Sequence, residues 1–533
     1  ATGGVVNLVT NQPEFTRSGQ LSLTAGNLDR VNVRAHLTGD ISDSWAGRLS
    51  FSSISRDGFI ANRETGNDLS DENRESIRAS LRYKPNERLD ARLSIDASRE
   101  RETGAPRDIV EDGTFNGGIH AITDPGPRAI NAPVDPFIDR DIRGLTLQAD
   151  YQLPLGLLTS VTAYRETDAD WQHPFFGNPV TSTTIESTSI NEEVYEQLSE
   201  ELRLSFARDD GRISGLVGIF AFRADIDRLV TLNQQFSAFL PFLGGIAHYD
   251  QRIETRSLAI FSEADFKLGN DLTLTIGGRY SVEKKKQEHS GTVLLGPSPP
   301  PLSPLNQFKD LQTDDRWTAF TPKISVAWKP SSEVMIYGMA AKGFKSGGYQ
   351  GIPPDVHAAM TPFDPEYIWN YELGLKMFSS NQRFKLNAAV FHMDYEDLQV
   401  AELIAGERIV IGNAAEAESK GLELEFELKV SSRLQLTGSY SYLDARFTEF
   451  ASGATDDNSG NRLPMAPRHK VFLGLDVGLL TLPQGSLEMH VDWNRQSTTY
   501  LEPANSLEVQ GNYSVWNARL TFVSTDRDWE LSA

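Results

Sequence analysis

The chain has 533 residues and no cysteine, so it can hold neither a disulfide framework nor a thiolate metal site. Its 73 acidic and 51 basic residues give a formal net charge of −22, which excludes the basic surface that nucleic-acid-binding proteins need. No apolar run approaches the roughly 18 residues of a transmembrane helix.

The sequence is expected to be truncated at both ends. The chain opens at Ala1 with no initiator methionine and no signal peptide, and the first strand is expected near Phe15–Ala25. The last strand is entered after Arg527 and stops at Ala533. We therefore expect a fragment of a longer protein.

Very short turns alternate with long polar loops along nearly the whole chain, and an amphipathic strand is expected on each side of every turn. Short turns at one end of the strands and long loops at the other are typical of transmembrane β-barrels of bacterial outer membranes. Ten tight turns are predicted, at Ser42–Ser44, Pro85–Glu87, Pro154–Gly156, Asp209–Gly211, Gly269–Asp271, Pro330–Glu333, Ser379–Gln382, Ser431–Arg433, Leu482–Gly485 and Thr525–Arg527.

The predicted strands alternate strictly between apolar and polar residues. Leu272–Tyr280 shows this period of two, and so does Leu422–Val430, which places Glu423, Glu425 and Glu427 on the face opposite its apolar residues. We expect the three glutamates to line a wet lumen. Two roles stay open for them: guiding a substrate, or holding the lumen contents in place.

Two other architectures compete with a membrane barrel. A soluble sheet would bury its apolar face in a core, but segments such as Arg383–Val400 are far longer than the usual 5–6 residues of globular strands. A β-propeller shares the repeat length of roughly 45–70 residues but needs turn signals every 8–12 residues, and the sequence lacks them. A mean hydropathy of −0.37 also fits a barrel, because a spanning strand shows lipid only every second residue.

The predicted fold is therefore all-β, a transmembrane antiparallel up-and-down β-barrel. Ten turns imply about 21 strands begun in this sequence, and about 22 when the barrel is complete. Barrels of that size are plugged transporters rather than open porins. Aromatic residues that cluster near the strand ends fit the girdles at the membrane interfaces. They are Trp45, Tyr83, Trp171, Trp328, Tyr337, Trp369, Tyr371, Tyr395, Trp493, Tyr500 and Trp516.

Ligand capture is expected in the long loops, because loops on a rigid scaffold carry most binding residues. The longest predicted loops are Arg101–Asp141, Leu229–Asp250, Glu288–Asp314, Lys345–Pro365 and Glu449–Leu463. The candidate ligand-binding residues are Phe115, His120, Phe175, Phe176, Tyr249, Lys345, Tyr349 and Phe363. Their aromatic rings could stack on an aryl chelate or a flat corrinoid; the alternative is that they pack the loops against one another.

Three other polar segments have simple explanations. His392, Asp394 and Glu396 share one face of a strand and mimic a metal site, but we expect them to be ordinary lumen-facing polar residues. Asp456–Asn461 lacks the ligand spacing of a calcium loop. Lys342–Gly348 is followed by no helix that could present its N-terminus to a phosphate.

No motif for catalysis is present: there is no Gly-x-Ser-x-Gly elbow, no His-Glu-x-x-His and no convincing acid–base carboxylate pair. We predict no catalytic residues, no resident metal and no cofactor.

Six segments, taken in order, resemble the TonB-dependent receptors, which are energised outer-membrane transporters for scarce, bulky nutrients. The first resembles the end of the family's N-terminal plug, and the others resemble its barrel strands and the segments next to its loops. The segments are Gly3–Thr10, Lys342–Tyr349, Pro365–Lys376, Asn387–Tyr395, Ala417–Leu424 and Leu463–Lys470.

The resemblance divides the chain into residues 1–13, the C-terminal end of the plug domain, and residues 14–533, a barrel that lacks its last strand. It implies a monomer in the outer membrane of a Gram-negative bacterium, in contact with lipid and lipopolysaccharide. It also implies that TonB, with its inner-membrane energising complex, pulls on the plug through a segment (the TonB box) that this sequence does not contain.

The function expected from the resemblance is uptake of a ferric siderophore, with iron entering as part of the cargo. Uptake of a carbohydrate, cobalamin or aromatic compound is the transport alternative. A passive porin-like channel, or an adhesin or phage receptor that uses the same loops, is an alternative of a different class.

Overall fold

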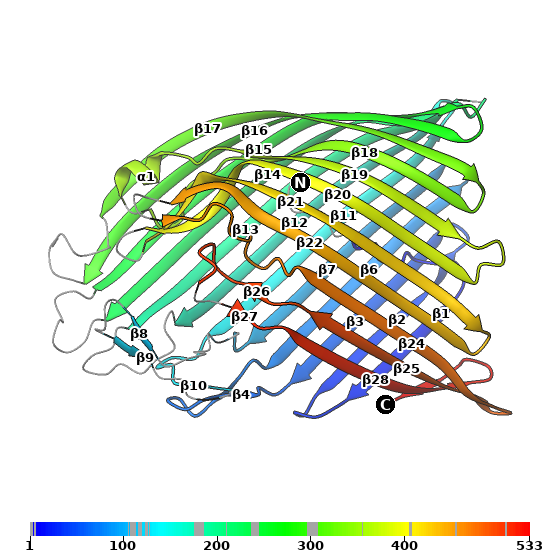
Figure 1. The fold of residues 1–533 in the computed structure, drawn as a ribbon, viewed down its shortest axis with the longest axis horizontal. Helices are drawn as coiled ribbons and strands as arrows, with labels where there is room; N and C mark the ends of the chain where they lie inside the picture. Colours follow the sequence, from blue (N-terminus) through cyan, green and yellow to red (C-terminus); the bar gives the residue numbers. More distant parts are fainter. Residues whose placement is uncertain are drawn as a thin grey trace.

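The computed structural model describes residues 4, 7–104, 106, 113–115, 120–122, 126, 128–174, 186–208, 210–235, 245–295, 307–353, 355–404, 408–452, 456–506 and 509–533. Strands dominate these residues, and their one helix, α1 (Val356–Met360), is five residues long. No helix in the described part of the chain is long and apolar enough to cross a membrane. Figure 1 shows the strands running obliquely in one curved sheet.

The described strands form a 22-stranded antiparallel sheet, in which β23 (Asp456–Asp457) is only a two-residue extension beside β22. Each of the other 21 strands pairs with the next one around the sheet. This order confirms the predicted up-and-down architecture and the count of about 21 strands begun. The strands are β1 (Ser18–Ala25), β2 (Val31–Ser42), β3 (Trp45–Arg56), β6 (Glu72–Asn86), β7 (Leu89–Glu102), β11 (Phe137–Leu153), β12 (Gly156–Pro174), β13 (Glu186–Ala207), β14 (Ile213–Gln235), β15 (Gly245–Leu268), β16 (Leu272–Leu295), β17 (Phe308–Ser331), β18 (Val334–Lys345), β19 (Glu366–Phe378), β20 (Phe384–Ile404), β21 (Arg408–Ser431), β22 (Leu434–Ser452), β24 (His469–Leu482), β25 (Gly485–Gln496), β28 (Tyr513–Ser524) and β29 (Glu530–Ser532).

All ten predicted turns fall between consecutive strands of this sheet. They gather at one end of the barrel in Figure 1, and α1 and the short loop strands gather at the other. The loop end is therefore the extracellular mouth expected from the sequence. The short loop strands are β4 (Ile60–Asn62), β5 (Asp68–Leu69), β8 (Gly113–Phe115), β9 (His120–Ile122), β10 (Ala129–Ile130), β26 (Thr499–Tyr500) and β27 (Val509–Gln510).

The sheet separates apolar and polar residues onto two faces. On the outward face Ile219, Ile260 and Phe320 lie in one lateral row, and each is at least half exposed. Trp493 and Trp516 also face outward, with ring centroids 5.8 Å apart. An outward apolar belt with aromatic residues is the surface that a bilayer covers.

The inward face of β6, β7, β11 and β12 carries ion pairs between arginine and aspartate. The guanidinium of Arg82 lies 2.6 Å from Asp90. Asp96 lies between two arginines: it forms an ion pair with Arg78 at 3.6 Å and accepts from Arg165 at 3.3 Å. The first two pairs link the neighbouring strands β6 and β7, and the Arg165–Asp96 pair reaches across β11 from β12 to β7.

The inward face of β20 and β21 is acidic. Register places Glu423, Glu425 and Glu427 on the face opposite the outward residue Leu422, as predicted. Lys385 of β20 lies 3.0 Å from Glu427.

The strands from β13 to β17 are longer than the sequence predicts. The predicted loops Leu229–Asp250 and Glu288–Asp314 were too wide, because β14 continues to Gln235 and β16 continues to Leu295. Above the apolar belt both faces of a strand contact water or loops. The alternation of apolar and polar residues is therefore lost there, although the strands still pair through their backbones. As a result, the sequence of such a segment resembles that of a loop.

The segment ahead of β1 enters on the lumen side. The backbone N–H of Glu14 donates to the Oγ1 of Thr38, which is buried on the inward face, at 3.0 Å. The carbonyl oxygen of Pro13 accepts from Arg82 at 3.4 Å, and the Arg82 guanidinium lies 5.9 Å from the ring of Phe15. Within the described residues, β1 pairs only with β2 and β29 only with β28.

Candidate ligand-binding site at the barrel mouth

The loop between β18 and β19, residues 346–365, is folded against the inside of the mouth. Glycine is required where this loop meets the wall, because a Cβ on Gly347 would lie 2.6 Å from a ring carbon of Trp317. Gly348 and Phe363 then form an antiparallel bridge across the loop. Asp355 caps α1 by accepting from the N–H of Ala358 at 2.8 Å.

Two buried glutamines hold this loop to one side of the wall. Gln251 of β15 donates to the side-chain oxygen of Gln287 at 2.6 Å and to the backbone oxygen of Gln350 at 2.9 Å. Gln287 of β16 donates to the backbone oxygen of Ala359 in α1 at 2.8 Å. Both wall glutamines are at most 2% exposed, so these amides satisfy each other and the loop backbone out of reach of water.

The other side of the wall holds the same loop through further amides. The Gln350 side chain donates to the backbone oxygen of Ile411 in β21 at 2.6 Å and accepts from the Ile411 N–H at 3.0 Å. Gln399 of β20 donates to the backbone oxygens of Ser346 and Asp364, at 3.0 and 2.9 Å. Because β15 and β21 are six strands apart around the sheet, the loop bridges two separate parts of the wall.

Asn413 of β21 completes the set. Its side chain accepts from the N–H of Asp364 at 2.7 Å and donates to the Asp364 carbonyl at 2.8 Å. We call these five neutral side chains the amide clamp: Gln251, Gln287, Gln350, Gln399 and Asn413.

A small apolar cluster underlies α1. Ala359 of the helix is fully buried against Val230, Ala247, Tyr249 and Phe308. This contact stabilises the position of the helix by removing apolar surface from water.

His289 of β16 lies in the same place, with its ring 5.0 Å from the Phe308 ring and 6.4 Å from the Tyr249 ring. The side chain is 1% exposed, and within the described residues neither ring nitrogen has a hydrogen-bond partner. Burial lowers the pKa of His289 to about 4, because an apolar environment disfavours the charged imidazolium.

Two charged groups reach the loop: Lys285, and Glu283, whose carboxylate accepts from the Ser346 hydroxyl. The ammonium of Lys285, on the inward face of β16, donates to the Ser346 hydroxyl at 2.9 Å and to the Gly347 carbonyl at 2.7 Å. It also lies 5.7 Å from the centroid of the Trp317 ring and 3.4 Å from Glu283. Lys285 therefore fixes the first turn of the loop.

Four of the eight predicted ligand-binding residues lie in or against this loop. Tyr249 and Tyr349 are 1% and 6% exposed, so in this conformation both rings pack the loop and the wall instead of presenting a surface. Burial raises the pKa of Tyr349. Lys345 is exposed, 3.9 Å from the buried carboxylate of Glu366, and Phe363 is half-buried.

The other four candidates remain predictions. Phe175 and Phe176 lie outside the described residues. Phe115 and His120 are register partners in the β8–β9 hairpin, and their side chains lie outside the described part of the chain. Sequence reasoning missed the amide clamp, because glutamine and asparagine in a long strand carry no distinctive local pattern.

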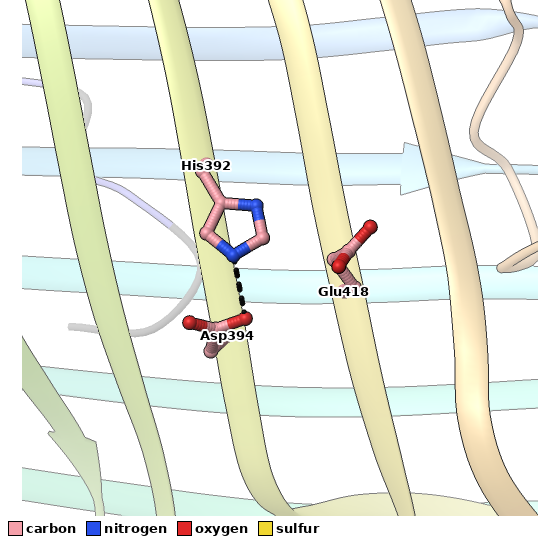
Figure 2. A group of neighbouring side chains, drawn as sticks. All are labelled: His392, Asp394 and Glu418. Atoms are coloured by element: carbon pink, nitrogen blue, oxygen red, sulfur yellow. Dashed lines mark ion pairs between the residues drawn. The ribbon is translucent and has the colours of Figure 1, made fainter.

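A second cluster lies on the outward face of β20 and β21. His392 and Asp394 are on adjacent outward positions, with Nε2 and Oδ1 2.8 Å apart, and the carboxylate of Glu418 is their neighbour on β21 (Figure 2). The ligand atoms of all three lie within 4.8 Å of one another. The ring of Tyr371 stacks beside His392 with centroids 6.4 Å apart.

The predicted lumen orientation of His392, Asp394 and Glu396 is wrong. These residues pair laterally with Tyr371, Trp369 and Tyr367, on the same face as Leu373, which is 56% exposed. The strand contains polar residues outward here because it has already passed the apolar belt. His392 and Asp394 are both more than 40% exposed, and Lys420 pairs with Glu418, so the three satisfy one another and their neighbours as surface ion pairs.

Comparisons with known proteins agree with this architecture. The family described as TonB dependent receptor-like, beta-barrel, matches residues 92–533. The chain is 24% identical to a pesticin receptor of Yersinia enterocolitica over 99% of its own length and 72% of that protein. It is 22% identical to a ferrioxamine receptor of the same species, over 97% of the chain and 71% of the relative. Among solved structures, the ferric yersiniabactin uptake receptor FyuA from Yersinia pestis superposes with a TM-score of 0.79 at 20% identity, covering 97% of this chain and 74% of that one.

Proposed function

This chain belongs to the TonB-dependent receptor family, and from that premise we propose that it takes up a ferric siderophore across the outer membrane of a Gram-negative bacterium. Iron is cargo in this proposal, carried inside the chelate. TonB would supply the work from the inner membrane, because the outer membrane holds no useful ion gradient of its own.

The observation that carries the proposal is the size of the barrel. Twenty-one strands follow one another in register around the described sheet, whereas porins with an open channel have about 16–18 strands. A sheet this large encloses a lumen that would leak unless something fills it. A passive porin is therefore the weaker candidate.

The names of relatives supply the ligand class. Ferrioxamine and ferric yersiniabactin are iron chelates, and they appear in the names of one relative and one structural neighbour. Because these proteins are at most about a quarter identical to this chain, we propose the class of ferric chelate and no particular member.

The mouth loop fits the role of a ligand-contacting element. Lys345 precedes the loop, with an exposed ammonium 3.9 Å from Glu366, and Phe363 lies near its other end with a half-buried ring. We propose these two residues as first contacts for a chelate carrying both anionic and aromatic groups. Tyr349 would contact the ligand only after the loop has moved.

The domain division also stays a proposal: residues 1–13 as the end of a plug, and residues 14–533 as barrel. The contacts of Pro13 and Glu14 with Arg82 and Thr38 support it, because both of these barrel residues face the lumen, which a plug would fill.

The first experiment is to compare the abundance of the full-length protein in iron-starved and iron-replete cells of its source bacterium. Strong induction by starvation is expected.

The second experiment measures uptake of radioactive iron in defined siderophores by cells with and without TonB. Uptake of one chelate that needs TonB supports the proposal. Uptake that ignores TonB would instead favour a passive channel, and unchanged abundance with no iron uptake would redirect the search to carbohydrates, cobalamin and aromatic compounds.

A further inference from the structure

One acidic residue lies on the lipid-facing side of the barrel within the apolar belt. Glu200 of β13 lies between Leu198 and Leu202 on the outward face, and both leucines are exposed. In the same lateral row, two strands away on either side, Leu147 and Leu258 are exposed as well. Apolar side chains that face lipid therefore lie above, below and on both sides of this carboxylate.

The depth of Glu200 also places it inside the membrane. It is seven residues above Ala207, the last residue of β13, and its neighbour Thr162 is six residues above Gly156, the first residue of β12. At about 3.3 Å per residue and a strand tilt of about 45°, both positions lie about 14–16 Å above the tight turns. The apolar band of an outer-membrane barrel is about 25 Å tall, so hydrocarbon surrounds Glu200.

Among the described residues, hydroxyl groups of the neighbouring strand are what reaches this carboxylate. Ser160 of β12 donates to Oε1 of Glu200 at 2.8 Å, and the hydroxyl of Thr162 donates to Oε2. Arg223, one row higher on β14, forms its ion pairs with acidic residues above it and not with Glu200. A carboxylate has about four acceptor sites, so about two of them are left without a donor.

Two outward acidic residues in another sector of the wall have basic partners. Glu418 pairs with Lys420, and Asp444 pairs with Arg446 at 2.9 Å. Lipid tails have no hydrogen-bond donors, and ionisable residues inside a membrane are rare and are usually paired. Glu200 is thus a group on the outward face that a donor from another molecule in the membrane would satisfy.

Symmetry selects a second copy of this chain as that molecule. Two copies that are inserted into one membrane in the same direction can pair about an axis along the membrane normal, and such an interface uses the same patch on both. Residues of equal depth then meet, so Glu200 lies opposite the same glutamate of the second copy. Two carboxyl groups that share one proton form a short O–H···O⁻ hydrogen bond, which makes this patch complementary to itself.

The side chains around Glu200 are short enough for two walls to approach closely. Ala221 is its lateral partner on β14 and Thr162 is its partner on β12, while Ser160 pairs with Ala149 in the row below. Small residues at an interface inside a membrane let the backbones of the two partners come close together. The shape of this patch therefore fits the same pairing as its chemistry.

We propose that the outward face of β12 and β13 is an interface with a second copy of this chain, centred on Glu200. The receptor is then a dimer in the membrane, in place of the monomer that the family resemblance implies. The inference does not depend on the transported ligand, because the interface lies on the lipid-facing side of the wall and the proposed ligand contacts lie at the mouth.

The test measures cross-linking of the full-length receptor in outer membranes. Ala221→Cys places a thiol beside Glu200, and the 533 residues contain no cysteine of their own. A short bis-maleimide is expected to convert this variant into a covalent dimer. Ala340→Cys is the matched control, because Ala340 also faces outward, six residues above the start of β18 and five strands away. It should give about tenfold less dimer, and the receptor without an added cysteine gives the background.

Substitution of Glu200 tests its role in the interface. Glu200→Leu presents an apolar side chain to lipid, so the barrel should fold, and heat-dependent gel mobility verifies this. Dimerisation should be about tenfold weaker, because the central charge-assisted hydrogen bond is lost. Glu200→Gln retains a donor and an acceptor and should keep most of the cross-linking. If Ala221→Cys does not fold, sedimentation of the wild type and of Glu200→Leu in detergent measures the same difference without a cysteine.

Three cross-linking results overturn the proposal. They are equal dimer in Ala221→Cys and Ala340→Cys, undiminished dimer when Glu200→Leu is added to Ala221→Cys, and an adduct of Ala221→Cys with a different protein and no dimer. A monomeric wild type in sedimentation also overturns it. None of these results bears on ferric siderophore uptake, which is measured separately.

Discussion

The amide clamp inside the mouth and a lateral row of four basic residues on the outer wall are built from opposite kinds of side chain. This cation row consists of Arg223, Arg256, Lys284 and Arg316 on β14 to β17. The clamp is neutral: three of its amides are buried and two are half-buried, and each donates to the loop backbone, to the wall backbone or to another clamp amide. The cation row is charged and exposed. Burying an ion costs far more than burying a hydrogen-bonded amide. A loop can therefore be fixed inside the wall by amides, whereas unpaired cations are tolerated on the exposed surface.

Side chains at the mouth also differ in whether they respond to pH. Clamp amides do not titrate, so the loop keeps its attachments over the physiological range. His289 is the exception next to the clamp, because it is buried, titratable and, in the described residues, without a hydrogen-bond partner for either ring nitrogen.

The largest effect is expected from removing both wall glutamines. The double variant Gln251→Ala and Gln287→Ala leaves the carbonyls of Gln350 and Ala359 without donors, and about 2 kcal/mol for each lost partner gives about 4 kcal/mol of loop stability. Hydrogen exchange of the Gly348 and Phe363 amides, which bond across the loop, should become about a thousandfold faster. The exposed residue Gln312 supplies the control substitution, Gln312→Ala. Unchanged protection in the double variant would show that the clamp does not hold the loop.

A somewhat smaller effect is expected from acid. The folded pKa of His289 is about 4 and its ordinary value is about 6.5, so the opened loop takes up a proton before the closed loop does. Loop stability should be constant above about pH 6.5 and fall by about 3 kcal/mol as the pH drops to 4. The measurement is exchange of the same two amides against pH, corrected for intrinsic rates.

The variant His289→Leu sharpens this prediction. It removes the titrating group and two unpaired ring nitrogens while keeping an apolar side chain. Protection of the two loop amides against hydrogen exchange should become independent of pH between 6.5 and 4. It should also be higher than in the wild type. A pH response that survives in His289→Leu would assign the effect to another group.

A third, smaller effect concerns the positive charge that holds the first turn of the loop. Lys285→Met removes the hydrogen bonds to Ser346 and Gly347 but keeps the length of the side chain. Hydrogen bonds from a charged group contribute about 1.5–3 kcal/mol, so a loss of about 2 kcal/mol at the first turn of the loop is expected. Lys286→Met, on the outward face of the same strand, is the control. Equal loss in both variants would mean that the lysines act through net charge.

The smallest effect is expected from the outward cluster. His392→Ala removes one member of a surface ion pair, and such pairs contribute about 0–1 kcal/mol. Barrel stability, measured by heat-dependent gel mobility, and uptake of the iron chelate should both be the same in His392→Ala as in the wild type. Added zinc should also have the same effect on the stability of both proteins. A rise in stability with zinc in the wild type, lost in His392→Ala, would instead make the cluster a metal site.

The sequence determined what depends on near neighbours in the chain. All ten turns and the number of strands follow from the spacing of turn residues. The two faces follow from the period of two, as Leu422 outward and Glu423 inward illustrate. The family followed from short segments such as Lys342–Tyr349. Each of these signals lies within about ten consecutive residues, where backbone geometry alone decides the structure.

Tertiary structure decided what depends on register between distant strands. Arg223 and Arg316 lie 93 positions apart in the chain yet belong to one row, and Gln350 meets both Gln251 and Ile411. The outward position of His392 likewise depended on where β20 leaves the apolar belt, which alternation alone does not reveal. A one-residue change in pairing would turn every side chain of a strand to the other face, so these neighbourhoods are fixed only when the whole sheet is assembled.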